Sequence, residues 1–129
     1  MGKSGYLIDT NSVIDFLNNN LPDSGSQFLS KVVDDVPIIS VISKMEVLGY
    51  NTPEKSYQTL LDFIDDSFVI GLTEEVIDMT INLRKINRIK LPDAIIAATA
   101  LVYDYTLISR NISDFKNVSG LELLNPHEL

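Results

Sequence analysis

Short apolar runs of strand length alternate with stretches of helical period along this chain of 129 residues. The strand-length runs are 6–9, 37–41, 68–71, 106–109 and 121–124. The helical stretches between them are 11–19, 25–34, 43–50, 53–66, 73–88 and 92–104. Because strands that alternate with helices are joined by right-handed crossovers, the pattern predicts an α/β fold with a parallel sheet covered on both faces. The length and the lack of a flexible linker predict a single domain over residues 1–129.

The composition excludes several kinds of site. There are no cysteines, which rules out disulfides, thiolate metal sites and cysteine nucleophiles. No apolar run is long enough to span a bilayer, and residues 1–5 lack a signal-peptide stretch and the myristoylation pattern. There is no Gly-rich phosphate loop or Ser–His–Asp arrangement, and His127 has no partner motif, so we expect it at the surface. These features predict a soluble, cytoplasmic protein without a membrane partner.

The net charge of −8 argues against a nucleic-acid partner, because phosphate contacts need lysine and arginine. The charge is not evenly spread, however. A basic strip lies within seven residues and consists of Arg84, Lys85, Arg88 and Lys90. The strip is compatible with a phosphodiester substrate, and it is nearly as well explained as the solvated end of a helix.

Four acidic residues stand where predicted elements begin or end: Asp9, Glu46, Asp93 and Asp114. Each has a purely structural explanation. Asp9 could cap the helix that follows it, and Glu46 could complete a capping box with Ser43 as the N-cap. Asp93 follows a proline in a first helical turn, where the helix dipole favours an anion, and Asp114 could order its own loop.

Taken together, the same four acids indicate a metal site. In a parallel α/β sheet, ligands bind beyond the carboxyl ends of the strands, and Asp9 and the loop with Asp114 leave such ends. Glu46 lies one helical turn after its strand, and Asp93 opens the helix that leads into the fourth strand. Converging carboxylates repel one another unless cations are present, and hard oxygen ligands suit Mg²⁺ or Mn²⁺. One or two such ions could polarise a phosphate and lower the pKa of a water.

The remaining acids and the aromatic residues are expected to have structural roles. Asp15, Asp104 and the pairs at 34–35 and 65–66 have the pattern of solvent-exposed positions. The aromatic side chains fit packing on helix faces and in strands better than stacking on bases; they are Tyr50, Tyr57, Phe63 and Phe68.

Four segments that follow one another along the chain carry a family resemblance: 7–11, 40–47, 88–100 and 107–115. In this order they resemble the segments of PIN-domain proteins and, within that class, of the VapC-type toxins of type II toxin–antitoxin modules. The resemblance implies a three-layer α/β/α PIN-like fold with a central five-stranded, mainly parallel sheet. It also implies an Mg²⁺- or Mn²⁺-dependent endoribonuclease that hydrolyses RNA phosphodiester bonds with a metal-activated water.

The resemblance assigns catalytic and metal-binding roles to the four acids. Asp9 and Asp93 are expected to contact metal most directly. Glu46 would bind metal or position the water, and Asp114 would act through a water.

Five further residues are predicted to line the pit or to contact substrate: Asn11, Ser43, Lys90, Arg110 and Asn111. Asn111 stands where some members of the family carry another acid, and an amide there reduces the charge available to a second metal. Arg110 has two equally good interpretations, contact with a substrate phosphate or pairing with an acid.

The resemblance also implies partners. An RNA substrate is expected, with tRNA or rRNA plausible, together with a cognate antitoxin that inserts a segment into the active-site groove. A homodimer is expected, and residues 43–66 would form roughly the antitoxin or dimer surface.

Three alternatives remain open. One is a PIN-fold module that binds a partner or a structural cation without catalysis, and another is a general PIN nuclease without an antitoxin. The third is a receiver-like phosphoacceptor, which needs an acid next to Asp9 and a lysine after the fourth strand. The sequence has neither, because Arg110 and Asn111 follow that strand.

Overall fold

A computed structural model describes residues 5–129 and contains a five-stranded sheet in the order β3-β2-β1-β4-β5. All four strand pairings are parallel. The strands are β1 (Gly5–Ile8), β2 (Ile38–Ser40), β3 (Phe68–Ile70), β4 (Tyr105–Ile108) and β5 (Leu123–Leu124). The predicted parallel sheet is therefore confirmed. The expectations for the extreme N-terminus concern residues 1–5, of which residues 1–4 lie outside the described part.

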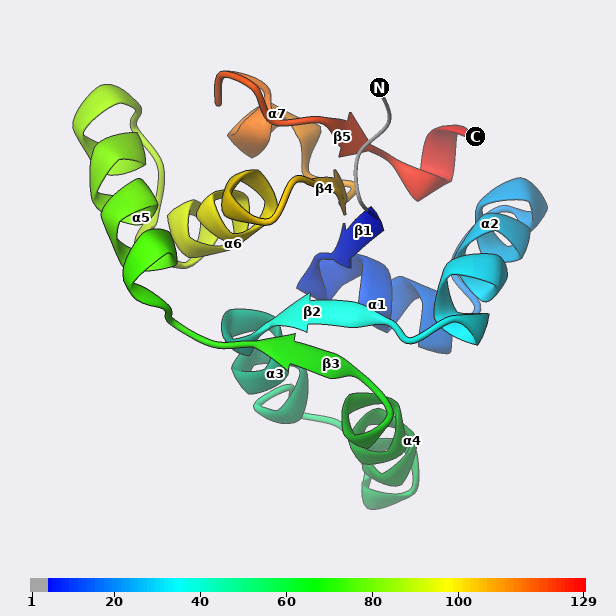
Figure 1. The fold of residues 1–129 in the computed structure, drawn as a ribbon. Coiled ribbons are helices and arrows are strands. Elements are labelled where there is room, and N and C mark those ends of the chain that lie inside the picture. The colour runs from blue at the N-terminus through cyan, green and yellow to red at the C-terminus, as the bar shows by residue number, and fades with distance from the viewer. Residues whose placement is uncertain (1–4) are drawn as a thin grey trace.

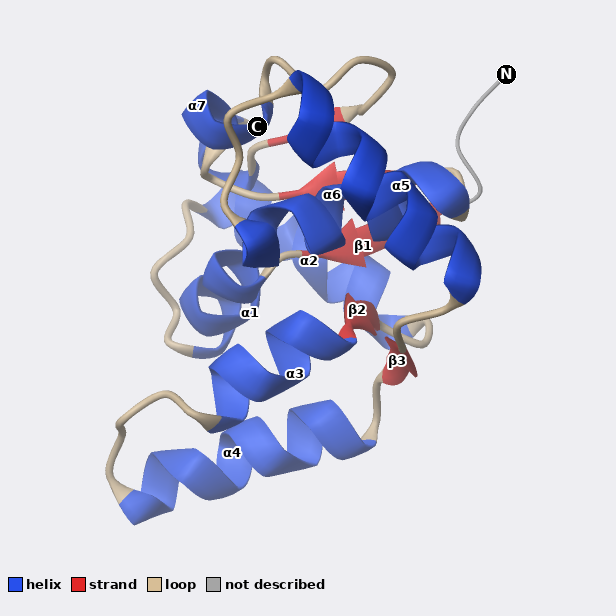
Figure 2. Ribbon diagram, turned by 90° about the vertical axis from the view of Figure 1, so that its left-hand side faces the viewer, coloured by secondary structure: helices blue, strands red, loops and turns tan. Residues whose placement is uncertain are grey.

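Helices cover both faces of this sheet (Figure 1). They are α1 (Thr10–Leu17), α2 (Asp23–Asp34), α3 (Val41–Leu48), α4 (Glu54–Asp65), α5 (Glu74–Ile86), α6 (Leu91–Val102) and α7 (Ile112–Phe115), with a 3-10 helix η1 (Pro126–Glu128). Figure 2 shows α5 and α6 on the near side of the strands, with α1 and α2 behind them. Within residues 5–129, no helix has the length and apolarity needed to cross a bilayer.

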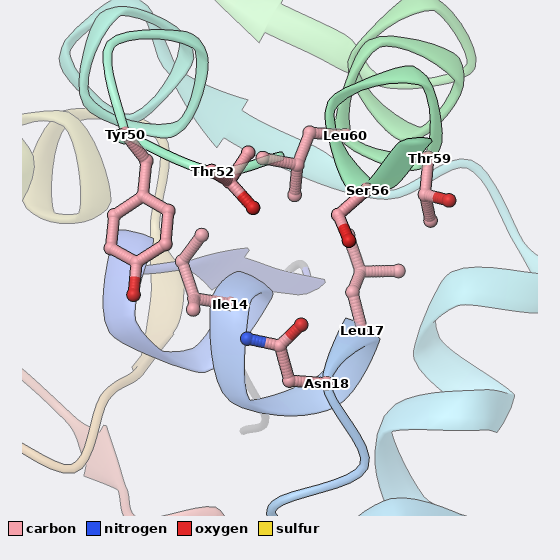
Figure 3. Close-up of a pocket in the computed structure, with 8 residues that line it drawn as sticks. All are labelled: Ile14, Leu17, Asn18, Tyr50, Thr52, Ser56, Thr59 and Leu60. Carbon is pink, nitrogen blue, oxygen red and sulfur yellow. The ribbon is translucent and has the colours of Figure 1, made fainter. Parts of the chain in front are cut away.

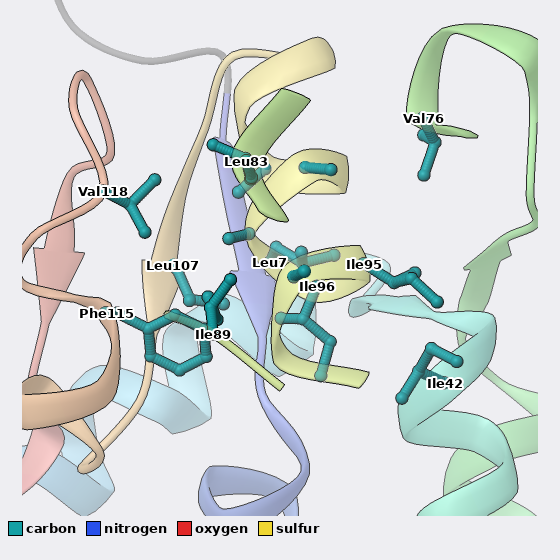
Figure 4. Packing of buried hydrophobic residues seen from close by; sticks show 14 residues of the cluster. Leu7, Ile42, Val76, Leu83, Ile89, Ile95, Ile96, Leu107, Phe115 and Val118 are labelled. Carbon is teal, nitrogen blue, oxygen red and sulfur yellow. The ribbon is translucent and has the colours of Figure 1, made fainter. Parts of the chain in front are cut away.

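Two hydrophobic cores form because successive residues of a strand point to opposite faces of the sheet. Leu7 of β1 and Leu107 of β4 are fully buried against α5, α6 and α7, in the cluster drawn in Figure 4. The next residue of each strand, Ile8 and Ile108, is fully buried against α1, α2 and α4. These central strands are therefore apolar throughout, as the sequence pattern indicated.

The start of α3 differs from the expectation. The helix begins at Val41, and Ser40 is its N-cap, with a side-chain oxygen that accepts a hydrogen bond from the Ile42 N–H. Ser43 lies inside the helix and is fully buried, so the predicted capping box with Glu46 is wrong. The two short helices near the C-terminus, α7 and η1, were not predicted, because single turns have too few residues to show a helical period.

The position of the site follows from the strand order. The chain turns from β1 to β2 on one side and reaches β4 on the other, so β1 and β4 form the point where the strand order reverses. In open parallel sheets, the loops that leave such a pair diverge and leave a crevice at the carboxyl edge. Asp9 and Ser109 follow these two strands directly.

Candidate active site

Asp9 joins the end of β1 to the start of α1. It is the N-cap of α1, and its Oδ1 accepts a hydrogen bond of 2.8 Å from the Thr10 N–H. Its own backbone N–H donates to the Ile108 carbonyl at the end of β4. The predicted cap is confirmed, and it fixes this carboxylate at the carboxyl edge of the two central strands.

The second oxygen of Asp9 is held by polar side chains from two elements. Ser109 Oγ donates to Oδ2 at 2.7 Å, and Asn11 Nδ2 donates to it at 3.2 Å. Asp9 is only 4% exposed, and this burial is the main reason that its pKa is raised to about 6. The nearby carboxylates of Asp93 and Glu46 raise the pKa a little further, whereas the hydrogen bonds from Ser109 and Thr10 favour the anion and lower it. The carboxylate is therefore ionised at neutral pH at a free-energy cost.

Glu46 reaches the same place from the exposed side of α3. Thr10 Oγ1 donates to Glu46 Oε1 at 2.6 Å and lies 3.0 Å from Ser43 Oγ. Ser43 is buried beneath the site and contacts Thr10, which in turn holds Glu46. Ser43 therefore does not line the pocket as predicted.

Asp93 lies in the first turn of α6 and is half-buried. Burial raises its pKa, the carboxylates of Asp114 and Glu46 raise it further, and Lys90 lowers it. Asp114 is exposed on α7, and its Oδ2 accepts a hydrogen bond of 2.8 Å from Asn111 Nδ2. The carboxylate of Asp93 therefore lies between Glu46 and Asp114 and is coupled electrostatically to both of them.

These residues line two adjoining pockets that share Asp93. The larger pocket brings together three predicted acids with Asn11, Arg110 and Asn111; the acids are Asp9, Glu46 and Asp93. The smaller pocket contains the fourth acid and part of the basic strip, with the lining Arg88, Ile89, Lys90, Asp93 and Asp114. Arg84 and Lys85 do not line either pocket.

The donor set suits a hard divalent cation, because it consists of carboxylate, amide and hydroxyl oxygens. Within residues 5–129, no three acidic or histidine side chains approach closely enough to form a ready-made metal cluster. Mg²⁺ commonly binds through one or two carboxylates and keeps several waters. Asp9 and Asp93, with buried or half-buried oxygens facing the pocket, fit that mode of binding.

The sequence interpretation missed a buried ionic cluster beside the site. Asp15 was expected at the surface but is only 4% exposed, so that expectation is wrong. Arg110 Nη1 donates to both of its carboxylate oxygens, at 3.0 and 2.9 Å, and His127 Nε2 lies 2.9 Å from Oδ2. Arg110 therefore pairs with an acid while lining the pocket, and His127 does have a partner.

The other structural expectations have mixed outcomes. Asp104 and the pairs at 34–35 and 65–66 are exposed, as predicted. Phe63 is buried in the core, whereas Tyr50 is 50% exposed and Phe68 is 58% exposed, so packing does not account for these two rings. Tyr50 instead lies on the rim of the larger pocket.

A family model described as "PIN domain" matches residues 6–121. "Ribonuclease VapC1" from Rickettsia felis is 50% identical over 32 residues, which are 25% of this chain and 24% of that protein. The chain thus matches about a quarter of the length of this curated relative.

Solved structures are similar over nearly the whole chain. A toxin–antitoxin complex from Klebsiella pneumoniae is 28% identical, with a TM-score of 0.78, and the match covers 97% of this chain and 100% of that one. VapBC2 from Rickettsia felis, bound to a DNA fragment from its promoter, is 26% identical, with a TM-score of 0.77 and coverage of 93% and 97%. Because the family model spans most of the sequence, the predicted resemblance is confirmed, and this chain belongs to the PIN-domain family.

Proposed function

We propose that this protein is a metal-dependent endoribonuclease, the toxin of a toxin–antitoxin module, and that residues 1–129 form one PIN-like domain. The observation that carries the proposal is the convergence of Asp9, Glu46 and Asp93 on one pocket at the carboxyl ends of the central strands. Membership in the PIN-domain family and similarity to a ribonuclease and to toxin–antitoxin structures support the same function.

The ligands proposed for Mg²⁺ or Mn²⁺ are Asp9 and Asp93, with Glu46 and Asp114 acting directly or through water. One or two bound ions would supply Lewis-acid activation of a water and of the scissile phosphate. Ser109 and the Thr10 N–H fix the carboxylate of Asp9, so this ligand needs little reorganisation.

Glu46 is suited to orienting the attacking water. Its Oε1 accepts the hydrogen bond from Thr10, which leaves Oε2 available to accept one from a water. Asn111 holds Asp114 in a similar way on the other side of Asp93. Lys90 and Arg110 lie at the edges of the two pockets, where they would attract the RNA backbone.

The proposed partners follow from the same assignment. A cognate antitoxin would close the active-site groove, and the protein would form a homodimer. Residues 43–66 would form roughly the antitoxin or dimer surface. The proposed consequence for the cell is a block in translation through cleavage of tRNA or rRNA.

A cleavage assay tests this function. Purified protein is incubated with end-labelled total tRNA, with rRNA, and with a DNA oligonucleotide of matched sequence. We expect cleavage of RNA with Mg²⁺ or Mn²⁺, loss of cleavage in EDTA, and recovery when Mn²⁺ is restored. Intact RNA with both ions would overturn the enzymatic assignment.

A non-catalytic binding module is the second candidate. It is favoured by one observation, that residues 5–129 contain no close group of three potential metal ligands. This candidate predicts that Mg²⁺ raises the melting temperature while every RNA stays intact. A rise in melting temperature together with RNA cleavage would eliminate it.

A further inference from the structure

A third pocket lies between α1 and the start of α4 (Figure 3). It adjoins the larger of the two pockets described above, which contains Asp9, Glu46 and Asp93 and is called the acidic pocket from here on. Its lining residues are Ile14, Leu17, Asn18, Tyr50, Thr52, Ser56, Thr59 and Leu60. In Figure 3, the side chains of α1 face those of α4 and of the segment after α3 across the pocket. Its cavity volume of about 70 Å³ has room for several water-sized groups, and so for one small part of a ligand that extends beyond it.

This pocket and the acidic pocket are continuous. Three residues line both of them, namely Ile14, Asn18 and Tyr50. Ile14 lies on α1 and Asn18 is the C-cap of that helix, one helical turn further on, while Tyr50 comes from the segment after α3. A ligand with one part in the acidic pocket could therefore place its next part in the pocket between α1 and α4.

The lining has no charged residue, although the neighbouring pocket is rich in carboxylates. Ile14, Leu17 and Leu60 supply apolar walls. The polar side chains in the lining make no hydrogen bond to any other residue in the described range 5–129; they are Asn18, Tyr50, Thr52, Ser56 and Thr59. The pocket thus suits a neutral group that carries hydrogen-bond donors and acceptors.

We infer that this pocket is a nucleobase subsite, which holds a base next to the scissile phosphate and stacks it on Tyr50. The inference rests on the proposed ribonuclease function. A nucleotide combines an anionic phosphate with a neutral aromatic base one sugar away, and the two adjoining pockets match that division. Tyr50 supplies the π-face, since half of its surface is exposed at the boundary, and the amide of Asn18 can contact a base edge.

A cleavage experiment on full-length protein tests the subsite. The probe is a single-stranded RNA pool of randomised sequence, cut in the presence of Mn²⁺, with the cut ends sequenced. Tyr50→Ala is expected to lower kcat/KM by about 5- to 150-fold and to weaken the base preference at one position beside the cut. Tyr50→Phe keeps the ring and should stay close to wild type. Asn18→Ala should change which base is preferred at that same position.

The matched control is Phe68→Ala, which removes an aromatic ring of similar exposure from β3, away from both pockets. It should leave rate and preference unchanged. If wild type cleaves the pool and both Tyr50→Ala and Asn18→Ala cut with unchanged rate and preference, the subsite is refuted. If these two variants lose only the affinity for a protein inhibitor, the pocket is a protein-docking site and the inference also fails.

A binding assay separates this inference from the proposed function. Anisotropy of the labelled RNA pool is measured in EDTA with wild type, Tyr50→Ala and Phe68→Ala. If wild type binds the pool in EDTA but does not cleave it with Mn²⁺, and only Tyr50→Ala weakens binding, the subsite stands and the nuclease assignment fails. If the wild type neither binds nor cleaves the pool, both fail.

Discussion

Ser109 Oγ donates a hydrogen bond of 2.7 Å to Asp9 Oδ2 and so joins residues that are 100 positions apart in the chain. The bond connects the ends of the two central strands, β1 and β4, at the point where the strand order reverses. It holds in place a carboxylate that burial makes costly to ionise. The stability of the fold and the chemistry proposed for the site are therefore linked through Asp9.

Asp9→Asn is expected to raise stability at neutral pH in the absence of metal. The pKa of Asp9 is about 6 in the folded protein, above its ordinary value of 3.8, so the folded state binds the proton more tightly. Stability therefore falls as pH rises from about 4 to about 6, by at most about 3 kcal/mol, and this loss persists at higher pH. Asparagine removes this loss and remains a good N-cap. Urea unfolding of wild type and Asp9→Asn in EDTA, at pH 5 and at pH 8, measures this difference in stability.

The control for this measurement is Asp66→Asn, which changes an exposed acid at the end of α4. It should alter stability equally little at both pH values. An Asp9→Asn protein that is less stable than wild type at pH 8 would show that the buried charge is compensated in some other way.

Divalent cations should raise the melting temperature of the wild-type protein. An ion that binds only the folded state stabilises it by about 2.7 kcal/mol at 100 times its dissociation constant. Asp9→Asn and Asp93→Asn should each remove most of the rise, whereas Asp66→Asn should keep it. Thermal shift with Mg²⁺ and with Mn²⁺ provides the measurement. An equal rise in all four proteins would locate the ion elsewhere.

The cluster of Asp15, Arg110 and His127 should behave as a coupled unit. Arg110→Gln leaves the buried carboxylate of Asp15 with His127 as its partner and should lower the free energy of unfolding by about 1–2 kcal/mol. The loss is modest because the Arg110 side chain is 55% exposed and water screens its charge. Combining Arg110→Gln with His127→Gln should cost more than the two single changes together. In an Asp15→Asn background, both substitutions should cost little.

Chemical denaturation of these variants gives the coupling energies. Arg88→Gln, which changes an exposed arginine on the basic strip, is the control and should be neutral. Strict additivity of the Arg110 and His127 substitutions would mean that Asp15 does not couple them.

Gly25→Ala should destabilise the protein through the C-terminal segment. A Cβ at Gly25 in α2 would overlap the carbonyl oxygen of Pro126 in η1, and backbone atoms cannot rotate away. Overpacking of this kind typically costs about 1–3 kcal/mol. Gly71→Ala is the matched control, because a Cβ there meets nothing within 4 Å. Urea unfolding distinguishes the two, and equal stability would show that η1 docks loosely.

The arrangement of the sheet could be predicted from the sequence because it is encoded locally. Each central strand is a short apolar run such as Tyr105–Ile108, and each crossover has helical spacing. The start of α3 could not be predicted in the same way. Ser40 and Ser43 are both plausible caps, and only the burial of Ser43 beneath Thr10 decides between them.

The convergence of the acids could be anticipated because each acid stands at an element end. The burial of Asp15 could not, because its partners Arg110 and His127 are 95 and 112 residues away. An acid in the middle of an amphipathic helix has no local mark of burial. The position of Tyr50 in the lining of two pockets was missed for a similar reason, since it depends on how α1 and α4 face each other.

The acidic pocket is proposed to hydrolyse RNA, and a comparison of wild type with Asp93→Asn tests this role most directly. The substitution is nearly isosteric at a half-buried position, so the fold should persist, which a thermal melt verifies. Single-turnover cleavage of one labelled RNA with Mn²⁺ should slow by at least about 100-fold. Cleavage by Asp93→Asn at the wild-type rate would contradict the proposed role of the pocket.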